Sequence, residues 1–264
     1  MKKLLLSCTF ILMISMLVAQ NNTCTDSCEF KMKEYPILFQ QRAAEYRALC
    51  YQAFNLAALR LSMLPKTNTR RAIITDLDET ILDNSYQQAE LIVNNQPYTG
   101  KSWKEWTDKS AATGVPGAVE FLQKAKQKGI TIFYISNRDT TEVKSTLLNL
   151  QKLKLPNADA AHMLFLSGTS SKEARRQLVM KKYNVVMLLG DNLNDFMQAF
   201  EKKNITDRFA ETDKVKAEWG KKFIVIPNAA YGEWENAIYD YERNLSPEQK
   251  EAKRKEKIIL PPGE

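Results

Sequence analysis

Short apolar runs alternate along the chain with segments in which apolar residues recur at helical spacing. Continuous apolar runs of five to seven residues are typical of strands covered on both faces, as in a parallel sheet. Two of the helical patterns have clear ends. Residues 116–129 open with proline and close with glycine, and Ser170 with Glu173 resembles a capping box at the start of 170–182. Strands that alternate with helices predict a doubly wound α/β fold. The five predicted strands are 71–77, 130–136, 161–167, 184–190 and 223–228.

Three further segments depart from this alternation. Apolar positions recur at helical spacing from Pro36 to about Leu64, before a break at Pro65. The stretch 84–115 is rich in Asn, Gln, Tyr and Trp, and we expect it to be an insertion that covers a site. The charged residues 246–257 predict a solvated helical tail. We therefore expect a leader at 1–19, a smaller, mainly helical accessory region at 20–70, an α/β domain at 71–235 and a helical tail at 236–264.

The first nineteen residues have the pattern of a secretory signal peptide. Lys2 and Lys3 precede an uncharged apolar stretch, 4–18, and the small residue Ala19 follows it. The apolar stretch is shorter than the roughly 20 residues that a membrane span needs. We therefore expect export and a mature chain from Gln20 with no stable membrane span, a retained N-terminal anchor being the alternative.

Composition restricts the partners and the redox chemistry. The formal net charge is +7, or +5 without the two lysines of the leader, and basic residues alternate with acidic ones. This distribution argues against a face for polymeric nucleic acid. Cys24, Cys28 and Cys50 follow the leader, and an odd number excludes a full disulfide framework. Cys50 fits a buried helical thiol, although Cys24 and Cys28 could pair with each other or either with Cys50.

Chemically active side chains follow the predicted strands at their carboxyl ends. In an open parallel sheet these ends meet at one edge, where ligands bind. Carboxylates that lie close together resist joint ionisation, and Mg²⁺ prefers carboxylate oxygens together with water and a substrate phosphate. The sequence therefore predicts a magnesium and phosphate site. Its candidate metal ligands are Asp76, Asp78, Asp191 and Asp195, and Ser136, Asn137, Arg138 and Lys172 reach the same edge.

Each side chain suits a particular role in phosphoryl transfer. Asp76 ends the first apolar run and is placed rigidly, as a carboxylate nucleophile requires. Asp78 follows two residues later, on the same side of an extended chain, and suits a general acid and base. Ser136 and Asn137 suit hydrogen bonds to phosphoryl oxygens, and Lys172 suits neutralisation of their charge. For Arg138 a surface ion pair is the simpler interpretation.

The longer motifs resemble one family. DLDETILDN (76–84) and GDNLNDF (190–196) look like the paired signatures of the class C bacterial acid phosphatases, the outer-membrane lipoprotein type, which are 5′-nucleotidase-like members of the haloacid-dehalogenase superfamily. The resemblance covers most of residues 70–235. It continues through GKSWKEW (100–106), VPGAVEFL (115–122), FYISNRD (133–139) and FIVIPNAAYGEWE (223–235).

The resemblance implies a haloacid-dehalogenase-like fold and a Mg²⁺-dependent acid phosphatase that uses an aspartyl-phosphate intermediate. It implies small phosphomonoester substrates, often nucleoside 5′-monophosphates, with the base held between Trp103 and Tyr231. Tyr86 is a weaker stacking candidate, because the family commonly has Ser-Pro-Tyr where this chain has Asn84-Ser85-Tyr86-Gln87. The implied location is the periplasm or cell envelope. Outer-membrane association stays open because the lipid-attachment cysteine is absent, and homo-oligomerisation stays open too.

The sequence argues against several other functions. His162 is the single histidine, which excludes a phosphatase built on two catalytic histidines. Cysteine phosphatases need an arginine six residues after the cysteine, where this chain has Glu34 after Cys28 and Leu56 after Cys50. A haloacid dehalogenase needs no acid at Asp78, and a phosphomutase would have to exclude water. A catalytically weak binding or storage protein on the same fold is the main alternative.

Overall fold

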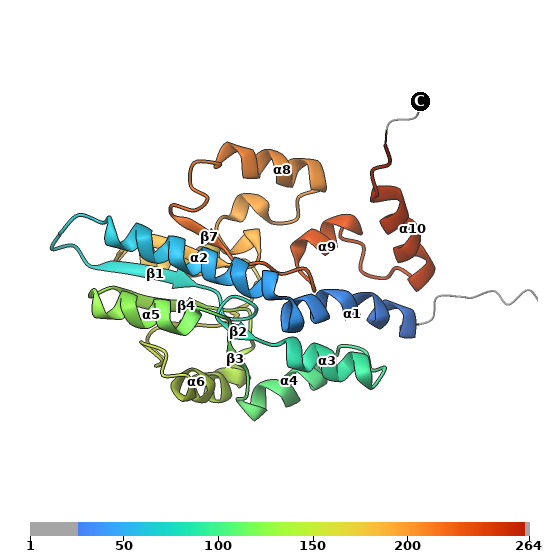
Figure 1. Ribbon diagram of the computed structural model, residues 1–264, viewed down its shortest axis with the longest axis horizontal. Coiled ribbons are helices and arrows are strands. Elements are labelled where there is room, and N and C mark those ends of the chain that lie inside the picture. Colours follow the sequence, from blue (N-terminus) through green and yellow to red (C-terminus); the bar gives the residue numbers. More distant parts are fainter. Residues whose placement is uncertain (1–25, 262–264) are drawn as a thin grey trace, which may run out of the picture.

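A parallel sheet forms the centre of the protein, which is represented by a computed structural model that describes residues 26–261 (Figure 1). Within these residues the main sheet has five strands in the order β5-β4-β1-β6-β7, and all neighbouring pairs are parallel. The predicted doubly wound α/β fold is therefore confirmed. The strands are β1 (Arg71–Thr75), β4 (Thr131–Ile135), β5 (Met163–Leu164), β6 (Asn184–Gly190) and β7 (Phe223–Val225).

Both faces of the sheet are buried, which explains the continuous apolar runs. Because side chains alternate along a strand, Ile73 of β1 packs with the buried faces of α2 (Ala44–Ser62) and α5 (Ala118–Gln127). Its neighbours Ala72 and Ile74 pack on the other face with α7 (Glu173–Met180). β1 lies at the centre of the sheet between β4 and β6, so the residues that follow it stand at the middle of the carboxyl edge.

The two outer strands are shorter than the apolar runs that predicted them. Of residues 161–167 only Met163–Leu164 form β5, and of 223–228 only Phe223–Val225 form β7. Each of these strands pairs on one side alone, with β4 or with β6. Beyond β5, Phe165 and Leu166 are only half-buried, whereas beyond β7 Ile226 is buried and its backbone N–H still donates to Gly190 O at 2.9 Å.

The helical region before the sheet forms two helices, whereas the sequence predicted a single helix from Pro36. α1 (Asp26–Arg42) contains Pro36, and α2 follows after Ala43, whose backbone is extended with ψ 127°. A proline inside a helix removes one backbone hydrogen bond. Side-chain contacts hold the second half of α1 in place, because Gln40 Nε2 donates to Asp83 Oδ1 at 2.8 Å and Gln41 Nε2 to Ser85 Oγ at 3.1 Å.

Residues 82–114 interrupt the alternation of strands and helices after β1. They form the two-stranded antiparallel pair β2 (Leu82–Asp83) and β3 (Thr113–Gly114), with α3 (Ser85–Val93) and α4 (Gly100–Lys109) between the strands. α1 packs against α3. Figure 1 shows α1, α3 and α9 (Glu233–Ile238) beyond the carboxyl end of β1, where the sequence predicted a site.

The remaining helices are α6 (Val143–Lys152), α8 (Ile205–Lys214) and α10 (Pro247–Lys257), the last with no buried residue. The predicted capping box of α7 is wrong. The helix begins after Lys172, without a side-chain cap, and Glu173 instead accepts hydrogen bonds from Arg176 Nη2 at 2.7 Å and Gln177 Nε2 at 2.6 Å. The Glu173 carboxylate thus binds residues of its own helix and does not cap the backbone N–H groups of the preceding turn.

The predicted leader at 1–19 lies outside the described residues, as do Cys24 and the side chain of Cys28. Among residues 26–261, no helix has both the length and the apolar character to cross a membrane. Cys50 is a free and fully buried thiol in α2, as its place in the helical pattern predicted.

Candidate active site

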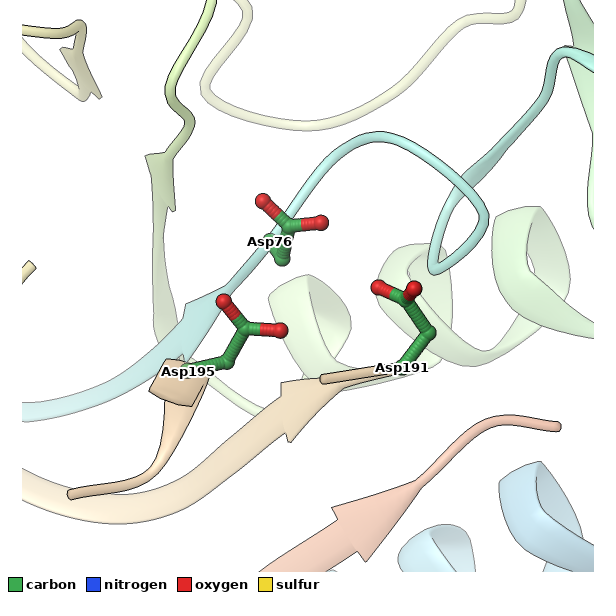
Figure 2. Close-up of side chains that lie close together, drawn as sticks. All are labelled: Asp76, Asp191 and Asp195. Carbon is green, nitrogen blue, oxygen red and sulfur yellow. The ribbon is translucent and has the colours of Figure 1, made fainter. Parts of the chain in front are cut away.

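Three aspartates from two neighbouring strands face one another at the carboxyl edge of the sheet. Asp76 follows β1, and its backbone N–H donates to Leu189 O at 3.0 Å, which extends the ladder to β6. Asp191 follows β6, and Asp195 ends the 3-10 turn Leu193–Asp195. Each offers one carboxylate oxygen, and in the described part of the chain these atoms lie within 4.8 Å of one another (Figure 2).

A glycine makes this approach feasible. A Cβ atom on Gly190 would lie 2.5 Å from both Cβ and Oδ2 of Asp195, a distance that no side chain could tolerate without moving the aspartate. The turn is closed by the backbone N–H of Asn192, which donates to Asp195 Oδ2 at 3.1 Å. After β6 the chain therefore turns back tightly, and Asp195 packs against Gly190 at the end of the strand.

Lys172 is the cation of the cluster. It lies at the N-terminus of α7, and its Nζ donates to Asp76 Oδ1 and, at 2.7 Å, to Asp195 Oδ1. All three of these side chains are at least nine-tenths buried. Lys172 therefore joins the ends of β1 and β6 and places its charge beside Asp76.

The cluster carries more negative charge than Lys172 balances. Burial raises the pKa of Asp76 well above its usual value, and the adjacent Lys172 offsets only part of this. Burial, and then the Asp195 carboxylate, raise the pKa of Asp191 to about 7. Burial alone would lower the pKa of Lys172, but the two aspartates it contacts raise it above its ordinary value. Three carboxylates thus face a single ammonium group. Their oxygen atoms are ligands of the kind that a hard divalent cation prefers.

Both oxygens of Asp191 are oriented by neighbours that the sequence did not single out. Thr80 Oγ1 donates to Asp191 Oδ1 at 3.0 Å, and Asn228 Nδ2 donates to Oδ2 at 2.8 Å. Partners of this kind fix the direction in which a metal ligand presents its oxygens. Thr80 belongs to the DLDET motif and Asn228 to the FIVIPNAAYGEWE motif, so both could have been found from the same signatures.

Asp78 lies in the same cavity, but its carboxylate is turned toward Arg138 and is not part of the three-aspartate cluster. Arg138 Nη2 donates to Asp78 Oδ1 at 2.7 Å, and Nε lies 3.1 Å from both carboxylate oxygens. Arg138 is 3% exposed, whereas the sequence interpretation placed it on the surface. The helix α6 covers it, and Thr146 Oγ1 of that helix accepts from Nη1 at 3.0 Å.

The two polar residues before Arg138 have different environments. Ser136 is buried and does not line the cavity; its Oγ accepts from the Arg138 backbone N–H at 3.1 Å and donates to Asp78 Oδ2 at 3.4 Å. Asn137 does line the cavity. Arg175 supports both, with Nη1 donating to Ser136 O at 2.7 Å and Nη2 to Asn137 Oδ1 at 2.6 Å. Nothing in the sequence distinguished Arg175 from other helical arginines.

The cavity over these groups has a volume of about 540 Å³. Three aromatic residues line it, namely Tyr98, Trp103 and Tyr231, and together they form what we call the aromatic wall. The rings of Tyr98 and Trp103 are 6.2 Å apart with a 45° interplanar angle. Tyr86 is half exposed and does not line the cavity, so the structure brings Trp103 and Tyr231 to the site but not Tyr86.

Tyr231 is anchored by a buried carboxylate. Its hydroxyl donates to Glu79 Oε2, and Glu79 Oε1 accepts the Asn84 backbone N–H at 2.9 Å. Burial, followed by the nearby Asp78, raises the pKa of Glu79 well above its usual value. Glu79 has φ 59°, a left-handed conformation that is uncommon outside glycine. This sharp turn lets the loop after β1 reach both the aspartate cluster and the aromatic wall.

A solved acid phosphatase structure resembles this chain over most of its length. The class C acid phosphatase of Bacillus anthracis, with tungstate bound, superposes with a TM-score of 0.83 at 37% sequence identity and covers 88% of this chain and 98% of its own. A second structure of that enzyme gives the same values.

More distant plant relatives match about two thirds of the chain. Vegetative storage protein 2 of Arabidopsis thaliana is 24% identical over 188 residues, which cover 67% of this chain and 68% of the relative. The stem 28 kDa glycoprotein of Glycine max is 25% identical over 182 residues, with 66% and 69% coverage. The family model of the HAD superfamily, subfamily IIIB (acid phosphatase), matches residues 5–234. Because this match spans most of the chain and the Bacillus enzyme agrees in structure, the chain belongs to the HAD-superfamily subfamily IIIB acid phosphatases and is a phosphomonoesterase.

Proposed function

We propose that this phosphomonoesterase depends on Mg²⁺, prefers nucleoside 5′-monophosphates and passes through a phosphoryl group bound to Asp76. The supporting observation is the arrangement of Asp76, Lys172 and Asp195, in which one buried ammonium contacts two carboxylates at the ends of adjacent strands. A carboxylate held in this way is fixed in direction, as in-line attack on phosphorus requires.

The metal would be held by the carboxylates of Asp76 and Asp191, with Asp195 close enough to contribute an oxygen or to orient a ligand water. When bound, Mg²⁺ supplies positive charge that offsets the crowded carboxylates and the phosphate oxygens. The three oxygens within 4.8 Å and the excess of negative charge fit such a cation. Asp78 remains a candidate through its position in the motif, although its carboxylate is engaged by Arg138.

The reaction then has two steps on this chain's own residues. In the first, Asp76 attacks phosphorus, a new bond forms between its oxygen and phosphorus, and the bond from phosphorus to the leaving oxygen breaks. Asp78 gives its proton to that leaving oxygen. In the second, a water attacks phosphorus, returns one proton to Asp78 and releases inorganic phosphate from Asp76. Lys172 and the side chain of Asn137 stabilise the phosphoryl oxygens in both steps, and buried Ser136 contributes through its contact with Asp78.

The aromatic wall motivates the nucleotide preference. Trp103 and Tyr231 line the same cavity as Asp76, and Tyr98 lies against Trp103. Stacking on such rings stabilises a bound base by about 1–3 kcal/mol and tolerates different bases. The cavity volume of about 540 Å³ is within the usual range for small-molecule sites.

A storage or binding role is the second candidate, and the name of the Arabidopsis relative is what favours it. A protein that had lost catalysis would be free to lose its nucleophile and the lysine that contacts it. This chain retains Asp76, Asp78, Lys172 and Asp191, so turnover is the better proposal. We also propose that the chain is exported to the periplasm or cell envelope, on the basis of the leader-like residues 1–19.

The test is phosphate release by purified residues 20–264 between pH 5 and 8, with Mg²⁺ or with EDTA. Substrates are nucleoside 5′-monophosphates, sugar phosphates and an aryl phosphate. Asp76→Asn is expected to lower kcat more than about a thousandfold, while Asp108→Asn, an exposed residue of α4 paired with Lys104, serves as the matched control. Rapid quenching of the wild type should yield a phosphorylated peptide that contains Asp76.

Each part of the proposal has its own contrary result. Normal turnover by Asp76→Asn would reject the nucleophile, and full activity in EDTA would reject the metal. Equal kcat/KM on all esters would reject the nucleotide preference. Tight binding of these esters by folded protein, without phosphate release, would favour the storage role.

A further inference from the structure

Arg138 contacts the candidate acid and the candidate stacking residue at the same time. One edge of its guanidinium faces Asp78, with Nη2 2.7 Å from Oδ1. Its Cζ lies 5.5 Å from the centroid of the Trp103 ring, a cation–π contact. Nη1 donates to Thr146 Oγ1 at 3.0 Å. The side chain is therefore fixed on three sides, and it is nearly inaccessible to solvent.

The two oxygens of Asp78 are held unequally. Oδ1 accepts from Arg138 Nη2 and also from Asn84 Nδ2 at 2.8 Å. Oδ2 has longer contacts, 3.1 Å to Arg138 Nε and 3.4 Å to Ser136 Oγ. Asn84 is itself held by Trp106, whose Nε1 donates to Asn84 Oδ1 at 2.8 Å. Oδ1 thus accepts two short hydrogen bonds from fixed donors, and Oδ2 is the less engaged oxygen.

We propose that Arg138 is a positioning residue for proton transfer, which holds Oδ1 of Asp78 and leaves Oδ2 to exchange the proton with the substrate. The inference rests on the proposed function of Asp78. In the first step the proton moves from Oδ2 to the leaving oxygen as the bond from that oxygen to phosphorus breaks. In the second step a proton of the attacking water returns to Oδ2. The contact with Trp103 keeps this geometry aligned with a group bound at the aromatic wall.

The proposal predicts a dependence on the leaving group. An alkoxide such as the 5′-oxygen of a nucleoside needs a proton as it departs, whereas a nitrophenolate is stable without one. Lysine in place of Arg138 keeps the charge but lacks the planar fork that binds a carboxylate through two nitrogens. Arg138→Lys should therefore impair hydrolysis of nucleoside monophosphates much more than that of 4-nitrophenyl phosphate.

The experiment compares kcat/KM on adenosine 5′-monophosphate and 4-nitrophenyl phosphate, with Mg²⁺, for the wild type, Arg138→Lys and Arg138→Gln. Positioned proton transfer contributes about 10²–10⁴-fold, so we expect roughly a hundredfold loss on the nucleotide and only a few-fold loss on the aryl ester. The ratio of the two values does not depend on the folded fraction of a variant. Arg47→Lys is the matched control, because Arg47 also lies over an aromatic ring, Tyr51 at 5.2 Å, but on the exposed surface of α2.

A second measurement tests whether Arg138 acts through Asp78. In an Asp78→Asn background, Arg138→Lys should cause no further loss on the nucleotide, since the effects of residues in one unit are not additive. Equal losses on both substrates, or additive losses in the double variant, would overturn the positioning role. Failure of the wild type to hydrolyse either ester would reject the proposed function itself. Normal turnover by the wild type, with Arg138→Lys equally active on both esters, would reject only the role of Arg138.

Discussion

Thr80 and Asp191 join the loop after β1 to the end of β6 through a hydrogen bond of 3.0 Å from Oγ1 to Oδ1. The same hydroxyl lies 3.5 Å from Asp76 Oδ2, so Thr80 contacts two of the three clustered carboxylates. Thr80 is fully buried and cannot exchange these partners for water. Its hydroxyl therefore orients both carboxylates at the point where a metal would bind.

Removal of this hydroxyl should weaken metal binding while leaving the fold intact. Loss of a partner that orients a metal ligand typically costs about 10–100-fold in metal affinity or activity. We expect Thr80→Val to raise the Mg²⁺ concentration for half-maximal activity by that range, and Thr80→Ser to stay close to the wild type. Titration of activity with Mg²⁺, and calorimetry with Mg²⁺ alone, measure the effect. Identical Mg²⁺ titrations for Thr80→Val and the wild type would contradict the role given to Thr80.

Gly190 should tolerate no side chain. An added Cβ would meet Asp195 at 2.5 Å, so Gly190→Ala must displace Asp195 and separate it from Lys172. We expect a loss of kcat of at least about a hundredfold, comparable with removal of a positioned charge, and a lower Tm. Gly100→Ala is the control, because nothing lies within 4 Å of a Cβ there. A fully active Gly190→Ala variant would mean that Asp195 does not need its present position.

The positions of the clustered residues could be predicted from the sequence because the strands that carry them are simple. β1 and β6 are continuous apolar runs buried on both faces, so their ends, and hence Asp76 and Asp191, could be located in the sequence. In a parallel sheet these ends must share an edge. Lys172 was predicted at the start of a helix, and its contact with Asp76 and Asp195 follows from the same edge.

Side-chain direction could not be predicted in the same way. Asp78 was expected to point with Asp76, since both lie on an extended chain, but the carboxylate turns to a partner 60 residues further along. Arg138 looked like any surface arginine because burial by α6 is a tertiary effect. The break at Ala43 and the continuation of α1 through Pro36 were missed for the same reason, since contacts with Asp83 and Ser85 hold that helix in place.

The aromatic wall gives a prediction that separates two tyrosines close in sequence. Tyr98 lines the cavity beside Trp103, whereas Tyr86 does not. Loss of one stacking contact of about 1–3 kcal/mol corresponds to about a 5- to 150-fold rise in KM. We expect Trp103→Ala and Tyr98→Ala to raise KM for nucleoside monophosphates within that range and to leave KM for a non-aromatic ester such as glycerol phosphate little changed. Because Trp103 also contacts Arg138, Trp103→Ala should lower kcat on both esters as well. Tyr86→Ala should match the wild type on both substrates, and a selective nucleotide defect in that variant would place the base elsewhere.

Cys50 provides a prediction about stability that is independent of the active site. Burial raises the pKa of its thiol to about 11, and the side chain lies on the buried face of α2 with no exposure to solvent. An unfolded cysteine ionises near pH 8.5, so above that pH the unfolded chain loses a proton that the folded chain retains. The contribution of Cys50 to stability should therefore be complete below about pH 8.5. It should decline as the pH rises toward about 11.

Thermal unfolding of the wild type and Cys50→Ala between pH 7 and 11 measures this decline, with the other cysteines present in both proteins. The alanine variant should be less stable at pH 7 because it leaves a cavity, and the difference in Tm should shrink as the pH rises. Iodoacetamide at pH 8 should leave Cys50 unmodified in the folded protein and alkylate it after denaturation, as peptide mapping would detect. A constant Tm difference across this range, or rapid alkylation in the native state, would show that the thiol is more accessible than its burial in α2 implies.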